Sequence, residues 1–190
     1  MLATKPYLRE NALLYARRWA FARNPLFYNF TEVGGDCTNF VSQAVLAGSC
    51  TMNFTPTFGW YYRSVEDRAP AFTGVDAFWR FFTGAPDFAS ANGGVGPFGR
   101  QVEPGELAVG DVVQLSDRAG EFYHTLLVSA IEEGEILVAA HSNDALDRPL
   151  RSYPAAGARF LHIEGVRFAV PDAPCFAGLI NGVALPLREN

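Results

Sequence analysis

A cysteine set between a glycine pair and an apolar helical run constrains this 190-residue chain more than any other feature. Residues 34–44 read GGDCTNFVSQA. The two glycines permit a tight turn with unusual backbone angles, Asp36 suits a helix N-cap, and the run that follows predicts a helix ended by Gly48. Cys37 is therefore expected in the first helical turn. Unpaired N–H groups and the helix dipole favour a thiolate there, so we expect a lowered pKa and a nucleophilic sulfur.

The competing interpretation of Cys37 is a buried structural cysteine, because free cysteine is among the most buried residue types. A cysteine nucleophile needs a nearby base, and imidazole is the usual one. A histidine in a suitable structural context would therefore favour the catalytic interpretation over the structural one.

A predicted β-hairpin supplies that histidine. His124 opens an apolar and β-branched run, a Glu-rich turn follows, and a second apolar run returns to residue 142. Folding the hairpin about its turn places Asn143 opposite His124 and His141 opposite Leu126, so we expect these four residues to share one face. A catalytic imidazole needs a third group to fix its tautomer, and this face offers two polar candidates.

These motifs together resemble a known family, the bacterial putative amidase domain family, which is related to the NlpC/P60 and CHAP cysteine peptidases, all of them papain-like. The resemblance covers residues 7–153. It rests on residues 11–20, 24–25, 34–43, 110–114, His124 and 141–144. It implies one α+β, papain-like domain over residues 1–190, with N-terminal helices packed on an antiparallel sheet formed mainly by residues 108–168.

The resemblance also implies an activity and residue roles. Its members are thiol hydrolases of amide bonds, and peptidoglycan stem peptides are the familiar substrate of the wider group. By carry-over, Cys37 is the nucleophile and His124 is the base. Relatives place His, Asn, Gln or Glu at the third position. We predict His141 there, because a strand holds its residues more rigidly than a turn, with Asn143 and Asp144 as alternatives.

Aromatic and polar residues upstream and downstream of Cys37 are candidates for the substrate cleft. Tyr28 or Asn29 could help to hold the oxyanion, since relatives use a polar or Tyr residue before the cysteine, and the backbone N–H of Cys37 is the simpler donor. Trp60 lies in an aromatic cluster that could line a groove for a glycopeptide. Core packing is the competing interpretation of these aromatic residues and the more common one.

Composition narrows the remaining possibilities. A hydrophobic content of 49% supplies one sizeable core. The net charge of −5 argues against nucleic acid as a partner. No apolar run predicts a transmembrane segment or a signal peptide, so we expect no membrane partner and a cytoplasmic monomer unless export information lies outside this sequence. Histidine spacing predicts no metal site, and no cofactor is expected.

The three cysteines do not form a disulfide framework. Cys50 and Cys175 lie in apolar surroundings and are interpreted as core residues, with a disulfide between them as the alternative. Two other functions remain open for the chain as a whole. It could be a non-catalytic module that binds a peptide or glycan in the same cleft, or an acyltransferase that uses the same thioester.

Overall fold

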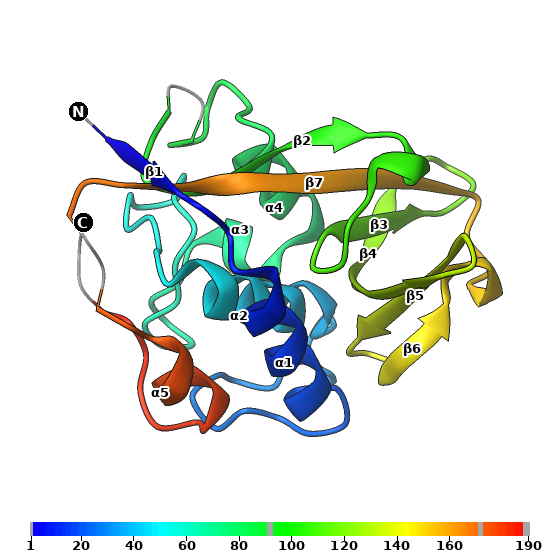
Figure 1. Cartoon of the computed structure of the whole chain (residues 1–190), viewed down its shortest axis with the longest axis horizontal. Coiled ribbons are helices and arrows are strands. Elements are labelled where there is room, and N and C mark those ends of the chain that lie inside the picture. Colours follow the sequence, from blue (N-terminus) through cyan, green and yellow to red (C-terminus); the bar gives the residue numbers. More distant parts are fainter. Residues whose placement is uncertain (1, 91–92, 171–172, 188–190) are drawn as a thin grey trace.

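The computed structural model describes residues 2–90, 93–170 and 173–187 and has the expected α+β architecture, with helices packed against an antiparallel sheet (Figure 1). The helices are α1 (Arg9–Trp19), α2 (Cys37–Ser49), α3 (Pro70–Thr73), α4 (Val75–Phe82) and α5 (Phe176–Ile180), with short 3₁₀ turns at Pro104–Glu106 and Leu150–Ser152. The strands are β1 (Ala3–Lys5), β2 (Gly96–Val102), β3 (Val112–Ser116), β4 (Phe122–Glu132), β5 (Glu135–Ala140), β6 (Ala145–Pro149) and β7 (Gly157–Phe168).

The strands form a single seven-stranded sheet within the described residues, in the order β1-β7-β3-β4-β5-β6, and β2 pairs with the remaining edge of β7. Every pairing is antiparallel. β7 is the longest strand and crosses the whole molecule in Figure 1. Most of the sheet falls within residues 108–168, as predicted, and β1 and β2 extend it.

Helix α1 forms because its apolar residues recur at helical spacing. Ala12, Tyr15, Ala16 and Trp19 are buried, while Glu10 in the first turn and arginines in the last turn complement the helix dipole. The salt bridge from Arg9 Nη1 to the buried Asp111 Oδ1, at 2.7 Å, fastens the start of α1 to the sheet.

Helix α2 is the centre of the molecule, and all 13 of its residues are buried. It packs against α1 and against β4 and β5. The main hydrophobic core lies between the helices and the sheet, and a second cluster covers the other face of β3, β4 and β5. Leu127 belongs to the first core, whereas its neighbours Leu126 and Val128 belong to the second. Alternate residues of β4 thus face α2.

A β-bulge in the β4–β5 hairpin makes the observed strand register differ from the predicted one. Near the turn Ala130 pairs with Leu137, as the predicted hairpin requires, but beyond the bulge Val128 pairs with Val138. The register is then displaced by one residue, and such a displacement moves side chains to the opposite face. Its continuation sets His141 opposite Thr125, so the prediction that His124 and His141 share a face is wrong.

Cys50 and Cys175 form a disulfide with a Cα–Cα distance of 5.5 Å. The interpretation of both as simple core cysteines is therefore corrected, and the alternative of a bond between them holds. Cys50 is the C-cap of α2 and Cys175 the N-cap of α5, so the bond ties the C-terminal segment to the central helix.

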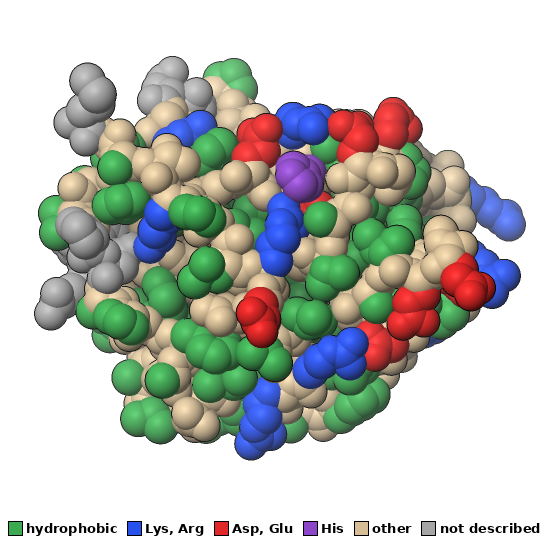
Figure 2. All heavy atoms as spheres, viewed as in Figure 1, with side chains coloured by type: hydrophobic (Ala, Val, Ile, Leu, Met, Phe, Trp, Pro, Cys, Tyr) green, Lys and Arg blue, Asp and Glu red, His purple; other side chains and the backbone are tan. Residues whose placement is uncertain are grey.

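On the face drawn in Figure 2, basic and acidic side chains are interspersed among apolar ones. No helix within the described ranges is long and apolar enough to span a membrane.

Candidate active site

Cys37 occupies the first position of α2, as predicted, and only 6% of its surface is exposed. Gly34 and Gly35 precede it with φ angles of 89° and 103°, the conformation that favours glycine. The sulfur lies 3.9 Å from Thr38 Oγ1, and backbone amides of Cys37, Thr38 and Thr125 hydrogen bond with it. These amides form a donor-rich pocket that would favour an anion on the sulfur.

Burial has a larger effect on the pKa of the Cys37 thiol than these hydrogen-bond donors have. Desolvation raises the pKa of the Cys37 thiol above its ordinary value, and the hydrogen bonds from Thr125 and Thr38 only partly offset the rise. The predicted lowering of this pKa by the helix terminus is therefore wrong. The thiol of Cys37 is therefore neutral at pH 7.

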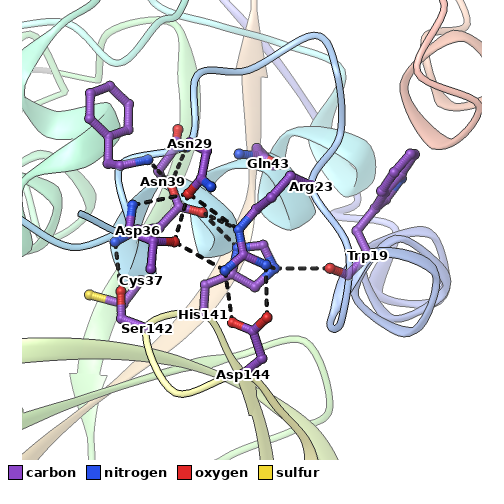
Figure 3. A network of polar contacts seen from close by, with 12 residues as sticks. Trp19, Arg23, Asn29, Asp36, Cys37, Asn39, Gln43, His141, Ser142 and Asp144 are labelled. Atoms are coloured by element: carbon purple, nitrogen blue, oxygen red, sulfur yellow. Dashed lines mark hydrogen bonds and ion pairs between the residues drawn. The ribbon is translucent and has the colours of Figure 1, made fainter. Parts of the chain in front are cut away.

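Asp36 determines the shape of the turn that carries Cys37. Although it is the N-cap residue, its side chain makes no capping bond with α2. Its Oδ1 instead accepts hydrogen bonds from the backbone N–H of Phe30 at 3.0 Å and from the side chain of Asn39 at 2.8 Å. Its Oδ2 lies 2.7 Å from Nδ1 of His141 (Figure 3). This buried carboxylate thus joins three separate segments around the cysteine.

His141 is the second buried member of this network. Its Nε2 lies 2.9 Å from the carbonyl oxygen of Trp19, and its ring stacks on Phe40 with centroids 4.0 Å apart. Both ring nitrogens are therefore occupied by oxygen acceptors, one from Asp36 and one from Trp19. The expected hydrogen bond between His141 and His124 is not formed, because the displaced strand register turns His141 toward α2.

The residues after His141 complete the support of the cysteine turn. Ser142 Oγ accepts a hydrogen bond from the backbone N–H of Asp36 at 2.8 Å. Asp144 forms an ion pair with Arg23 at 2.8 Å, and Arg23 also reaches Asp36 at 3.4 Å (Figure 3). Asn143 is exposed with a φ of 86°. Neither alternative for the third residue, Asn143 or Asp144, hydrogen bonds with His124 within the described chain.

His124 lies near the start of β4, one residue before Thr125, and 7% of its surface is exposed. Desolvation, with a smaller contribution from the charge of Arg148, lowers its pKa to about 4, so its imidazole is neutral at pH 7. The ring lies 5.8 Å from that of Tyr153, centroid to centroid. Among the described residues, no hydrogen bond or ion pair joins His124 to Cys37. Their connection runs through the backbone of Thr125.

The family model described as "Putative amidase domain" matches residues 6–163, which include His124, His141 and the cysteine turn. The chain belongs to this family. The uncharacterized protein YhbB of Bacillus subtilis is 30% identical over 143 residues, which are 73% of this chain and 42% of that protein. The chain therefore spans less than half the length of this relative. No solved structure matches it.

In this amidase-family domain, the residues predicted to line the substrate cleft differ in burial: Trp60 is buried, whereas Tyr28 is exposed. Trp60 is completely buried. It stacks on Phe81, packs at a tilt against Phe72, and donates its indole N–H to Ser42 Oγ at 3.1 Å. Its assignment to the cleft is therefore wrong, and core packing, the competing interpretation, holds.

Tyr28 and Asn29 lie on the exposed loop before the cysteine turn. The carbonyl of Tyr28 accepts a hydrogen bond from Asn39 of α2 at 3.0 Å. Asn29 Oδ1 accepts one from the backbone N–H of Thr31 at 3.0 Å, which is a local turn bond. The loop is thus attached to α2, and the role of Tyr28 and Asn29 at the oxyanion stays a prediction.

The same network includes residues that sequence reasoning did not single out for the site. Arg23 and Ser142 both contact Asp36. Neither residue is next to Asp36 in the sequence, so only the folded structure reveals these contacts. No group of three or more His, Cys, Asp or Glu side chains in the described part of the chain is arranged to hold a metal ion. His162, which sequence spacing did not favour as a ligand, is a β7 residue whose Nδ1 lies 2.7 Å from Asp111.

Proposed function

We propose that this domain is a cysteine-dependent amide hydrolase on a papain-like fold related to NlpC/P60 and CHAP peptidases, with Cys37 as nucleophile and His124 as base. The observation that carries the proposal is the placement of the free thiol. Cys50 and Cys175 are joined, so Cys37 is the free cysteine, and it lies at the N-terminus of the buried helix among backbone N–H donors. Membership of an amidase family supports amide bonds as the target.

In this mechanism the resting pair is a neutral thiol and a neutral imidazole. His124 accepts the proton of the Cys37 thiol as the sulfur attacks the amide carbonyl. The same imidazolium then protonates the leaving amine as the C–N bond breaks, which leaves a thioester on Cys37. Water, deprotonated by His124, hydrolyses the thioester and restores the thiol. In β4 the side chain of Thr125 contacts Thr38 of α2, and His124 alternates to the other face. The mechanism therefore requires a rearrangement on substrate binding that brings the imidazole to the sulfur.

The backbone N–H groups around the sulfur supply the oxyanion site in this proposal. The amide of Cys37 lies at the free end of α2, where N–H groups lack helical partners. Donors fixed in this way stabilise the tetrahedral oxyanion without rearranging during the reaction. A tight, well-positioned turn is therefore a requirement of the mechanism.

His141 serves this mechanism as a positioning residue. It holds Asp36, and Asp36 in turn fixes the segments on both sides of Cys37. His141 thus acts on the geometry of the nucleophile, in place of the predicted action on the tautomer of His124.

The substrate class we propose is a peptide or glycopeptide, including peptidoglycan-derived peptides. The test is incubation of the protein with purified peptidoglycan, muropeptides and simple acyl amides, read by mass spectrometry. Release of an amine and a carboxylic acid supports hydrolysis. Transfer of the acyl group to an added amine, without hydrolysis, would indicate an acyltransferase, and binding without turnover would indicate a binding module.

A further inference from the structure

The C-terminal segment of residues 173–187, here called the C-terminal strap, is largely exposed, and Phe176 and Leu185 pack only partly buried against the main core. Only Cys175 and Leu179 are buried within it, and no residue of the strap belongs to a strand. The disulfide to Cys50 is the only covalent attachment between the strap and the helical core. A segment with so little buried surface depends strongly on such a bond for its position.

The strap nevertheless supports the segment that follows α1. The carbonyl of Leu179 accepts a hydrogen bond from Asn24 Nδ2 at 2.8 Å, and the carbonyl of Ile180 accepts one from Trp19 Nε1 at 3.1 Å. Asn24 Nδ2 also donates to the hydroxyl of Tyr15 at 2.8 Å, and that hydroxyl donates to Gln43 of α2 at 2.8 Å. The contacts of Asn24 and Tyr15 are buried and that of Trp19 is partly buried, and buried polar groups are costly to leave unpaired.

The same segment, residues 19–24, also contacts the residues that hold the cysteine turn. The backbone carbonyl of Trp19 contacts Nε2 of His141, and His141 holds Asp36, the residue before Cys37. Arg23, in the same segment, pairs with Asp144 and Asp36. Residues 19–24 therefore contact both the strap and the network around the cysteine turn.

A small cavity of about 200 Å³ lies against the disulfide and is lined by Cys50, Cys175 and apolar residues of the strap. Cys50 is partly exposed. A thiol reductant can therefore approach the bond without unfolding the core.

We propose that the Cys50–Cys175 disulfide is a redox control site for the cysteine turn, which is ordered when the bond is formed and loosened when the bond is reduced. This inference rests on the proposed function for its activity readout. Reduction by a dithiol consumes two electrons and two protons: the S–S bond breaks, Cys50 and Cys175 become thiols, and the dithiol becomes a disulfide. When the strap is released, the hydrogen bonds from Trp19 to Ile180 and from Asn24 to Leu179 are lost.

The consequence concerns the compartment in which the domain is active. Disulfides persist in oxidising compartments and are reduced in the cytosol of most cells. A domain controlled in this way is active outside the reducing cytosol and inactive within it, which differs from the cytoplasmic location expected from the sequence.

The experiment treats the intact protein with dithiothreitol at neutral pH and follows two readouts. Hydrolysis of an acyl amide should fall at least tenfold, and the rate of Cys37 alkylation by iodoacetamide, resolved by peptide mass spectrometry, should rise several-fold as the turn loosens. This response is opposite to that of an ordinary thiol hydrolase, which a reductant leaves unchanged or activates. The double variant C50A/C175A should behave as the reduced protein and should ignore dithiothreitol.

Three outcomes would overturn the proposal: unchanged activity and unchanged Cys37 alkylation when mass spectrometry shows the bond open, activation by the reductant, or global unfolding on reduction seen by circular dichroism. Failure of the proposed function is a separate result. In that case the oxidised protein hydrolyses no amide, while the alkylation rate of Cys37 still responds to reduction. If C50A/C175A does not fold, the reduced wild-type protein alone decides the matter.

Discussion

His141 Nδ1 lies 2.7 Å from Asp36 Oδ2, and both side chains are 1% exposed. Asp36 is the residue before Cys37, so this contact fixes the turn that presents the sulfur. The relationship assigns His141 to the support of the nucleophile. It also explains why a histidine near a cysteine need not be its base: its two nitrogens are already occupied, here by Asp36 and Trp19.

We expect H141A to lower the free energy of unfolding by about 3 kcal/mol, because it leaves the buried Asp36 carboxylate without one partner and removes the ring stacked on Phe40. The matched control is D144A, which removes a partly exposed ion pair with Arg23 and should cost less than about 1 kcal/mol. Urea denaturation measures both.

Comparing H141A with H141Q separates a positioning role of His141 from a catalytic one. H141Q keeps a donor toward Asp36 and should recover part of the kcat lost in H141A, with the pH profile unchanged. A shift of the kinetic pKa in H141A, with no change in stability, would make His141 a participant in proton transfer and contradict the positioning role.

The pKa of His124 predicts an acid-sensitive stability. Burial lowers it from 6.5 to about 4, so the folded chain binds fewer protons than the unfolded chain between these values. Its contribution is fully present above pH 6.5 and is lost as pH falls toward 4, by up to about 3 kcal/mol. Unfolding of H124Q at pH 7 and pH 4.5 provides the control, because carboxylates contribute equally to both proteins. Equal pH slopes for H124Q and the wild type would show that His124 is not buried as a neutral ring.

Alkylation of Cys37 should be slow at neutral pH in the free protein. Burial raises the pKa of this thiol above its ordinary value of 9.0, so the iodoacetamide rate should still be rising at pH 9, while the urea-unfolded chain reaches its plateau earlier. Because the other cysteines are joined, C37A should incorporate no label under non-reducing conditions. An alkylation rate that is half-maximal below pH 8 would contradict this and support the lowered Cys37 pKa expected from the helix terminus.

Trp60 tests the distinction between core and cleft. W60A should destabilise the domain by about 3–5 kcal/mol, because it removes a completely buried indole that packs on Phe72 and Phe81. W60F should cost less, since it loses chiefly the bond to Ser42. The control is Y28A on the exposed loop, with an expected change below about 0.5 kcal/mol. If W60F folds normally but raises KM tenfold, Trp60 contacts the substrate after all.

Much of the fold could be predicted from the sequence because periodicity is a local signal. The 3.6-residue pattern of α1, the turn at Gly34 and Gly35, and the apolar runs of β4 and β5 all depend on neighbouring residues. Strand β1 gives no such local signal, because Ala3–Lys5 is a strand only through its pairing with Val166–Phe168 of β7, more than 160 residues away.

The candidate site was less predictable, because its geometry depends on one bulge and on burial. The predicted hairpin register holds as far as Ala130 and is displaced before Val128, which is enough to send His141 to the face of α2. The charge state of Cys37 depends on desolvation, which no local motif reports. The disulfide could be given only as an alternative to two core cysteines, since Cys50 and Cys175 are 125 residues apart and no local pattern brings them together.

The most direct test of the account is amide turnover by the wild-type protein beside C37A, measured by mass spectrometry on muropeptides and simple acyl amides. We expect the wild type to release acid and amine and to show a transient mass increase equal to the acyl group on Cys37. C37A should fold normally and show neither. Turnover by C37A close to that of the wild type would contradict the assignment of Cys37 as the nucleophile.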